Sequence, residues 1–110
     1  MVIYEVNLTI DQEIYSQFVL WLNTHVKEML HFPGFIQASF LQPEENRSLQ
    51  ESLTIQYLLQ SRADLEHYLT EFAPKMREEG VKRFKDKFSI TRRVFSVQKI
   101  VKNPWENGSF

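Results

Sequence analysis

The chain has 110 residues, a net charge of −1 and no cysteine; 43% of its residues are hydrophobic and 14% are aromatic. This length suits one domain with its own core, and the apolar content excludes a chain that is disordered throughout. The lack of cysteine excludes disulfides, thiolate nucleophiles and cysteine-ligated metals.

The first half of the chain predicts a strand, a helix and a second strand. Apolar and polar residues alternate over residues 2–8, where Val2, Tyr4, Val6 and Leu8 share one face. Asp11 is a good N-cap for the following helix, and Glu13 adds negative charge to its first turn. The helical spacing of three and four residues then continues to Met29, through Ile14, Phe18, Trp21, Leu22 and His25. Pro33 and Gly34 end this helix of roughly five turns, and residues 35–41 form the second strand.

The second half repeats the pattern in a different order. Residues 42–48 are polar and contain Pro43, which predicts a turn, and residues 52–59 form the third strand. Ser61 can cap a second helix, in which the helical spacing is followed by Leu65, Tyr68, Leu69, Phe72 and Met76. Pro74 predicts a kink or a break in it near Ala73. Gly80 marks another interruption, before a short helix that ends near residue 84. Residues 88–97 are rich in β-branched and aromatic residues and form the fourth strand.

The order of these elements, β-α-β-β-α-β, predicts the topology. Right-handed crossovers place strand three between strands one and two, and strand one between strands three and four. The sheet order is then 4-1-3-2, which is that of an α+β ferredoxin-like sandwich. We expect one such domain over residues 1–100 and an irregular tail over 101–110.

Residues from most of the chain together resemble the DUF4286 family, small bacterial proteins of unknown function. The likeness covers residues 2–95. The matching positions are residues 3–8, Trp21, Leu22, Met29, Gln56, Tyr57, Tyr68, Leu69, Ala73, Pro74, Arg77, Glu79, Gly80, Arg83, Phe84, Phe88 and 91–94. The resemblance implies a ferredoxin-like fold related to the dimeric α/β-barrel superfamily, which includes antibiotic-biosynthesis-type monooxygenases and haem-degrading enzymes. It implies no activity.

Helices cover only one face of such a sheet, so the other face needs its own explanation. That face would show Ile3, Glu5, Asn7, Thr54, Gln56 and Leu58. Strand two would add either Gln37 and Ser39 or Ile36, Ala38 and Phe40, and strand four would add Arg92 or Arg93. The mixture is too apolar for water and too polar for a dry core, so we expect a second copy to cover it.

A buried Glu5 must be paired, and we expect an arginine of strand four to grip it with two hydrogen bonds. One interpretation is a polar pocket for a small ligand. The other, which we favour, is a salt bridge that fixes the register of a dimer.

Histidines offer the alternative chemistry. His25 follows Trp21 on the apolar side of the first helix, where it could bind haem iron, although a core histidine with one hydrogen bond is the more common case. His67 together with Asn7 weakly resembles the pairing of haem-degrading relatives. The ligand-binding candidates are therefore Glu5, Asn7, Trp21, His25, Gln56, Arg92 and Arg93.

Charge suggests one further partner. Residues 1–74 hold three Lys/Arg against ten Asp/Glu, whereas residues 75–102 hold ten against three. A nucleic-acid or protein adaptor acting through residues 75–93 is thus an alternative, but interspersed acids and the absence of an RNP-like motif make nucleic acid a weak expectation.

The overall expectation is a homodimer without a resident cofactor that takes a small ligand between sheet and helices. A monooxygenase-like or haem-degrading enzyme that uses the same cavity is the alternative. Residues 1–8 lack a secretory signal, and no stretch reaches the ~20 apolar residues that cross a bilayer, so we expect a cytoplasmic location.

Overall fold

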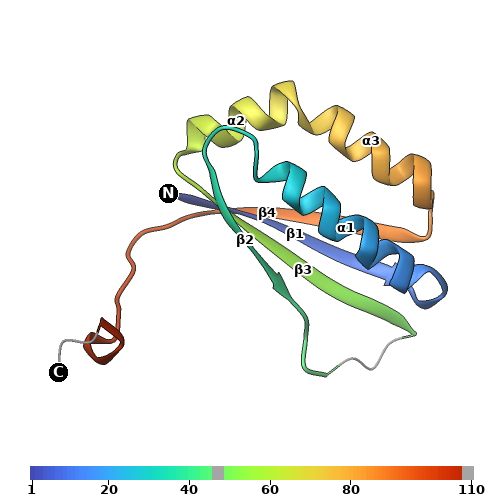
Figure 1. Ribbon diagram of the computed structural model, residues 1–110, viewed down its shortest axis with the longest axis horizontal. Helices are drawn as coiled ribbons and strands as arrows, with labels where there is room; N and C mark the ends of the chain where they lie inside the picture. Colours follow the sequence, from blue (N-terminus) through green and yellow to red (C-terminus); the bar gives the residue numbers. More distant parts are fainter. Residues whose placement is uncertain (46–48, 108–110) are drawn as a thin grey trace.

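The chain folds into a four-stranded sheet with helices on one side, as Figure 1 shows. The computed structural model describes residues 1–45 and 49–107. The elements in chain order are β1 (Val2–Asp11), a 3-10 turn η1 (Gln12–Ile14), α1 (Tyr15–Met29), β2 (Phe35–Leu41), β3 (Gln50–Leu59), α2 (Arg62–Glu71), α3 (Ala73–Phe84), β4 (Phe88–Ser96) and a 3-10 turn η2 (Pro104–Asn107).

The sheet order is β2-β3-β1-β4, and every neighbouring pair is antiparallel. This is the predicted order 4-1-3-2 read from the other edge, so the ferredoxin-like topology is confirmed. The register places Glu5 of the central strand β1 between Gln56 of β3 and Arg93 of β4. Glu5 therefore has a polar residue beside it on each neighbouring strand.

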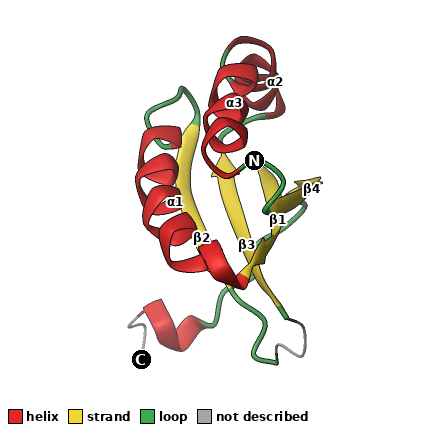
Figure 2. Cartoon of the chain, turned by 90° about the vertical axis from the view of Figure 1, so that its right-hand side faces the viewer, coloured by secondary structure: helices red, strands yellow, loops and turns green. Residues whose placement is uncertain are grey.

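The helices pack on one face of the sheet only (Figure 2). The apolar side chains that alternate along β1 and β3 are buried against them, as predicted. They form one core with buried residues of α1, α2 and α3, and this core contains Val2, Tyr4, Leu8, Ile10, Phe18, Leu22, Val26, Met29, Leu53, Ile55, Tyr57, Leu59, Leu65, Tyr68, Ala73, Met76 and Phe84. The opposite sheet face carries no helix, which leaves the β1 residues Ile3, Glu5 and Asn7 on the open side.

Strand β1 is longer than the sequence suggested, and Asp11 does not cap α1 with its side chain. Asp11 instead ends the strand: its backbone N–H donates to the Lys87 carbonyl, and its carboxylate accepts from Gln50 Nε2 at 2.9 Å. Pairing with β3 and β4 thus continues past Leu8, and a 3-10 turn separates the strand from the helix. The predicted cap at Asp11 was wrong because Asp11 makes its hydrogen bonds to Lys87 and Gln50 instead of to the start of α1.

The second helical segment breaks where Pro74 predicted. Helix α2 ends at Glu71, α3 begins at Ala73, and Pro74 occupies the first turn of α3, where its missing N–H costs nothing. Ser61 caps α2 as predicted, since its hydroxyl accepts from the Asp64 N–H at 3.1 Å. The predicted interruption at Gly80 was wrong: α3 runs through it, and the missing side chain makes room for Trp21, whose Cη2 would lie 3.0 Å from an added Cβ.

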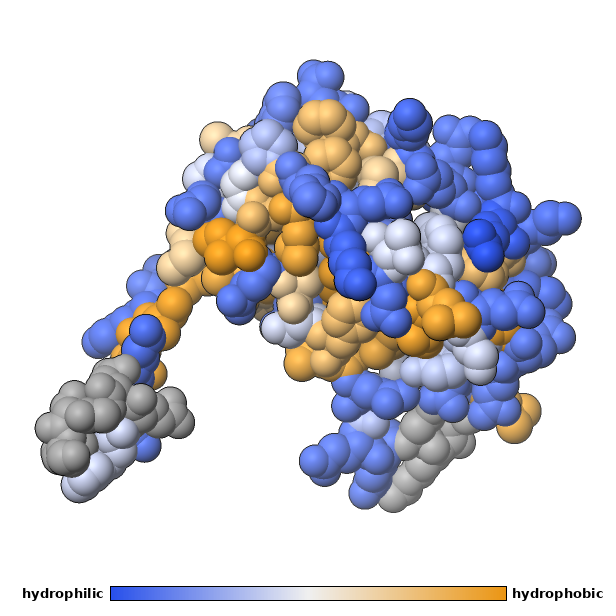
Figure 3. Space-filling view, viewed as in Figure 1, coloured by the Kyte–Doolittle hydropathy of each residue, from blue (hydrophilic) through white to orange (hydrophobic). Residues whose placement is uncertain are grey.

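The chain beyond β4 leaves the body of the domain in Figure 1. Ile100, Val101 and Trp105 are exposed there, and hydrophobic side chains reach the surface along this segment in Figure 3. Part of the predicted turn over residues 42–48 lies outside the described residues, as does the end of the predicted tail. No helix within the described ranges is long and apolar enough to span a bilayer.

Candidate functional site

The open sheet face carries a hydrogen-bonded network centred on Glu5. Asn7 Nδ2 donates to Glu5 Oε2 at 3.0 Å, and Gln56 Nε2 donates to Glu5 Oε1 at 3.0 Å. Arg93 Nε donates to Glu5 Oε2 at 2.7 Å in an ion pair, and Thr54 Oγ1 donates to Asn7 Oδ1 at 2.7 Å. The predicted pairing of Glu5 with an arginine of strand four is confirmed, with Arg93 as the partner. The contact is through Nε alone and not the two-bond grip we expected.

This network satisfies the carboxylate of Glu5, whose side chain is only 6% exposed. The hydrogen bonds from Asn7, Gln56 and Arg93 lower the pKa of Glu5 against the opposing effect of burial. The Arg93 side chain is 65% exposed, and its guanidinium lies 5.0 Å from the Phe95 ring centroid. A carboxylate with its partners already in place is better suited to holding the sheet together than to receiving a ligand.

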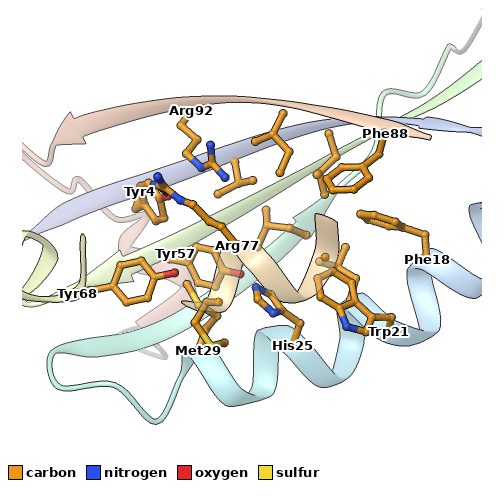
Figure 4. A pocket seen from close by; sticks show the side chains of 17 residues that line it. Tyr4, Phe18, Trp21, His25, Met29, Tyr57, Tyr68, Arg77, Phe88 and Arg92 are labelled. Carbon is orange, nitrogen blue, oxygen red and sulfur yellow. Dashed lines mark hydrogen bonds between the residues drawn. The ribbon is translucent and has the colours of Figure 1, made fainter. Parts of the chain in front are cut away.

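A cavity of about 60 Å³ lies on the other side of the sheet, between its helix-covered face and the helices (Figure 4). Strands β1, β3 and β4 form its floor, and α1, α2 and α3 form its walls. The lining residues are Tyr4, Val6, Leu8, Phe18, Trp21, Leu22, His25, Met29, Ile55, Tyr57, Tyr68, Met76, Arg77, Gly80, Phe88, Ile90 and Arg92.

Polar groups gather at one end of this cavity. Arg77 Nη2 donates to Tyr4 Oη at 3.2 Å, and Figure 4 shows Arg92 close by on the same side. Burial raises the pKa of Tyr57 and of Tyr68; nearby Arg77 and Arg92 oppose the rise at Tyr68. Tyr57 and Tyr68 therefore stay neutral hydrogen-bonding groups at ordinary pH, beside the two arginine side chains.

The opposite end is aromatic. Phe18 lies against Phe88, with ring centroids 5.0 Å apart, and against Trp21 at 5.6 Å. Between the two ends, His25 stacks on Trp21 at 4.7 Å with an interplanar angle of 25°. The cavity thus joins a cationic, hydroxyl-rich end to an apolar end.

His25 contributes a buried polar atom to the cavity. Its Nδ1 is buried and makes no hydrogen bond to any described residue. Burial lowers the pKa of His25, while the charge of Glu79 works in the other direction. The imidazole is therefore neutral near pH 7, with one ring nitrogen able to accept and the other able to donate.

The structure divides the seven predicted candidates into two groups on opposite faces of the sheet. Glu5, Asn7, Gln56 and Arg93 form the open-face network, whereas Trp21, His25 and Arg92 line the cavity. Asn7 and His67 are not brought together, because Asn7 lies on the open face and His67 is exposed on α2 against Phe72. The suggested haem-type pairing of these two residues was therefore wrong.

Among the polar residues of the cavity, sequence reasoning missed four. Tyr4 and Tyr57 were placed correctly on the helix-covered face but were treated as core, and Tyr68 and Arg77 were not singled out. Their hydroxyl and guanidinium groups meet only after α2 and α3 cross the sheet. The helical spacing of Tyr68 and the position of Arg77 next to Met76 were the available signals.

A second hollow of about 300 Å³ lies among the helices. The stacked rings of Phe32 and Phe72 line it, with centroids 4.4 Å apart, and exposed charged residues, mainly glutamates, surround them. It is larger, but it lacks the convergence of tyrosine, histidine and arginine that marks the first cavity. Among the described residues no group of three His, Cys, Asp or Glu side chains could hold a metal ion.

The fold is that of a ferredoxin-like domain with a cavity between sheet and helices. The sequence matches the family model of DUF4286, a domain of unknown function, over residues 1–98. The chain therefore belongs to the DUF4286 family. No curated protein sequence matches it.

Solved structures share this fold at low sequence identity. A protein from Deinococcus radiodurans, provisionally named an antibiotic biosynthesis monooxygenase, has a TM-score of 0.75 at 10% identity, covering 94% of this chain and 98% of that one. A dimeric ferredoxin-like protein from an uncultured marine organism has a TM-score of 0.72 at 15% identity, covering 91% and 97%. A point mutant of SnoaB, a cofactor-independent oxygenase from Streptomyces nogalater, has a TM-score of 0.69 at 12% identity, covering 93% and 98%. These likenesses establish the fold alone.

Proposed function

We propose that the chain binds a compact organic anion in the cavity between sheet and helices. The supporting observation is that one cavity joins Arg77, Arg92 and three tyrosines at one end to an aromatic wall at the other. Arginine recognises carboxylates by charge-assisted hydrogen bonds, and an apolar wall removes the body of the ligand from water. The ligand is thus an organic acid with its charged group at the arginines and its apolar part near Phe18.

The size of the cavity limits the ligand. About 60 Å³ is well below the ~150 Å³ of an engineered protein cavity that holds benzene. Arg77 and Arg92 are both exposed, so the charged group lies at the mouth and only the apolar part needs the enclosed space. A short-chain carboxylic acid is the class of ligand that suits a cavity of this size.

Binding of pentanoate, followed by NMR chemical-shift titration, tests this proposal. A ligand of seven heavy atoms is expected to bind with a Kd of about 1 mM. Replacing Arg77 with leucine should weaken binding about tenfold, since it removes one charge-assisted hydrogen bond. The matched control is Arg62→Leu, which makes the same change in charge on the outside of α2, where Arg62 pairs with Glu66. Equal weakening by both variants would show nonspecific attraction and contradict the proposal.

The enzymatic alternative rests on fold likeness, which does not carry an activity from one protein to another. Haem in particular does not suit the cavity, because ~300–1,000 Å³ is usual even for pockets of drug-sized ligands, against about 60 Å³ here. His25 lines the cavity, but His67 lies outside it.

We further propose that a second copy of the chain covers the open sheet face. Ile3 and Leu58 pair across β1 and β3 beside Phe95 of β4, which is 39% exposed, and Leu41 at the β2 edge is 42% exposed. These apolar residues surround the Glu5 network. An exposed apolar patch rimmed by polar residues marks a surface that is covered by a protein partner. One of the structural neighbours is itself a dimeric ferredoxin-like protein.

The dimer proposal predicts that Phe95→Glu lowers the solution mass from dimer to monomer, because two charges would enter a desolvated interface. Light scattering at micromolar concentration measures the mass. Leu20→Glu is the control: Leu20 is 72% exposed on α1, so the same substitution there should leave the dimer intact. A wild-type protein that is strictly monomeric at this concentration would overturn the proposal.

A further inference from the structure

The buried Nδ1 of His25 is the feature of the cavity that binding of a simple acid leaves unexplained. It lies inside the domain without a hydrogen-bond partner among the described residues. A buried polar atom that stays unpaired is costly, and native proteins rarely leave one so. The His25 ring reaches from α1 toward the middle of the cavity in Figure 4, with the arginines to one side and Phe18 and Phe88 to the other.

We propose that the ligand is a hydroxy acid whose hydroxyl group pairs with His25 Nδ1 while its carboxylate lies at Arg77 and Arg92. This inference rests on the proposed function and names its ligand class. A hydroxyl both donates and accepts, so it matches Nδ1 in either tautomer of the neutral imidazole. An amine would bring a positive charge beside two arginines, and an alkyl group would leave Nδ1 unpaired.

The surroundings of His25 favour a neutral partner of this kind. Stacking on Trp21 fixes the plane of the imidazole. The titratable and charged groups that line the same cavity are Tyr4, Tyr57, Tyr68, Arg77 and Arg92, and no carboxylate is among them. Glu79, whose charge partly offsets the lowering of the His25 pKa by burial, belongs to α3 but does not line the cavity. A hydroxyl is therefore the group that completes the site without adding charge to it.

The cavity size restricts the class to short chains. With about 60 Å³ of enclosed space, an aromatic hydroxy acid would need Trp21 or Phe18 to move, whereas an aliphatic one of four or five carbons would not. Because His25 lies apart from the arginines in Figure 4, we place the hydroxyl on carbon three or four, away from the carboxylate. This excludes 2-hydroxy acids, whose hydroxyl stays beside the carboxylate.

The test compares acids that differ only in a hydroxyl and a methyl group of similar size. Binding of 4-hydroxybutyrate and of pentanoate is measured by NMR titration against the wild type, His25→Phe and His25→Asn. We expect the wild type to prefer 4-hydroxybutyrate about tenfold, since pentanoate leaves Nδ1 unpaired. His25→Phe keeps the stacking on Trp21 but should lose this preference. His25→Asn places an amide near the Nδ1 position and should restore most of it.

The outcomes separate this inference from the proposed function. Equal affinity of the wild type for the two acids overturns the hydroxy-acid inference and leaves the binding of organic anions standing. A preference that survives in His25→Phe also overturns it, because the hydroxyl would then pair elsewhere. If neither acid binds the wild type while NMR shows a folded protein, the proposed function fails, and the inference fails with it.

Discussion

Replacing Glu5 with alanine is expected to lower the free energy of unfolding by about 3 kcal/mol at pH 7. The Glu5 side chain is 6% exposed and accepts hydrogen bonds from Asn7, Gln56 and Arg93. The substitution removes all three bonds from a central strand and leaves two partly buried amide groups without their acceptor. Urea denaturation measures the loss, which corresponds to roughly 12 °C in Tm for a domain of this size.

The control for this variant is Glu66→Ala, which breaks the Arg62–Glu66 pair on α2. Both of these side chains are more than half exposed, so the change should stay within about 0.5 kcal/mol.

The pH dependence of the free energy of unfolding gives a second check. Because hydrogen bonding lowers the pKa of Glu5 in the folded state, its contribution is complete above the ordinary value of 4.5 and is lost as the pH falls through the folded pKa. The difference in the free energy of unfolding between wild type and Glu5→Ala should therefore become smaller in acid. A difference that is independent of pH would mean that the network does not stabilise the charged form of Glu5.

The topology could be predicted from the sequence because it depends on local patterns. Alternation over β1 and β3 decides which side chains face the helices, and the chirality of crossovers decides the strand order. The pairing of Glu5 also followed from these rules, since a carboxylate on a half-covered sheet needs a cation on the next strand. The sequence left open which arginine it was, because a shift of one residue in the register of β4 exchanges Arg92 and Arg93 between the two faces.

The cavity could not be predicted in the same way. Its polar end forms only where Tyr4 of β1, Arg77 of α3 and Tyr68 of α2 come together. The sequence pattern within a single helix or strand does not predict the distance between the helices and the sheet. Gly80 shows the difficulty: a glycine in a helical pattern usually indicates an end, but here it admits Trp21 to the interior. Similarly, only the packed structure shows that His25 has a buried Nδ1 with no hydrogen-bond partner among the described residues.

Gly34→Ala is expected to lower the free energy of unfolding by about 3 kcal/mol, for two separate reasons. Gly34 has a φ of +85°, in the left-handed region, where alanine costs ~1–2 kcal/mol. An added Cβ would also overlap Cβ and Cγ of Asp64, the residue whose N–H is capped by Ser61 at the start of α2. Displacing Asp64 would weaken this cap, which is worth about 1 kcal/mol. Urea denaturation at pH 7 measures the total.

Two variants separate these causes. Asparagine tolerates the left-handed conformation, but its Cβ would still overlap Asp64. Gly34→Asn should therefore lose more than half of the free energy of unfolding that Gly34→Ala loses. Full recovery in Gly34→Asn would mean that the conformation alone sets the cost.

Gly80→Ala is the matched control, because that glycine lies inside α3 without a positive φ. Its gain of ~1 kcal/mol in helix propensity offsets the 3.0 Å contact with Trp21, and the free energy of unfolding should change little. If Gly80→Ala lowered the free energy of unfolding as much as Gly34→Ala, any added methyl group would be destabilising. Gly34 would then have no special role in positioning α2 and, with it, Tyr68 of the cavity.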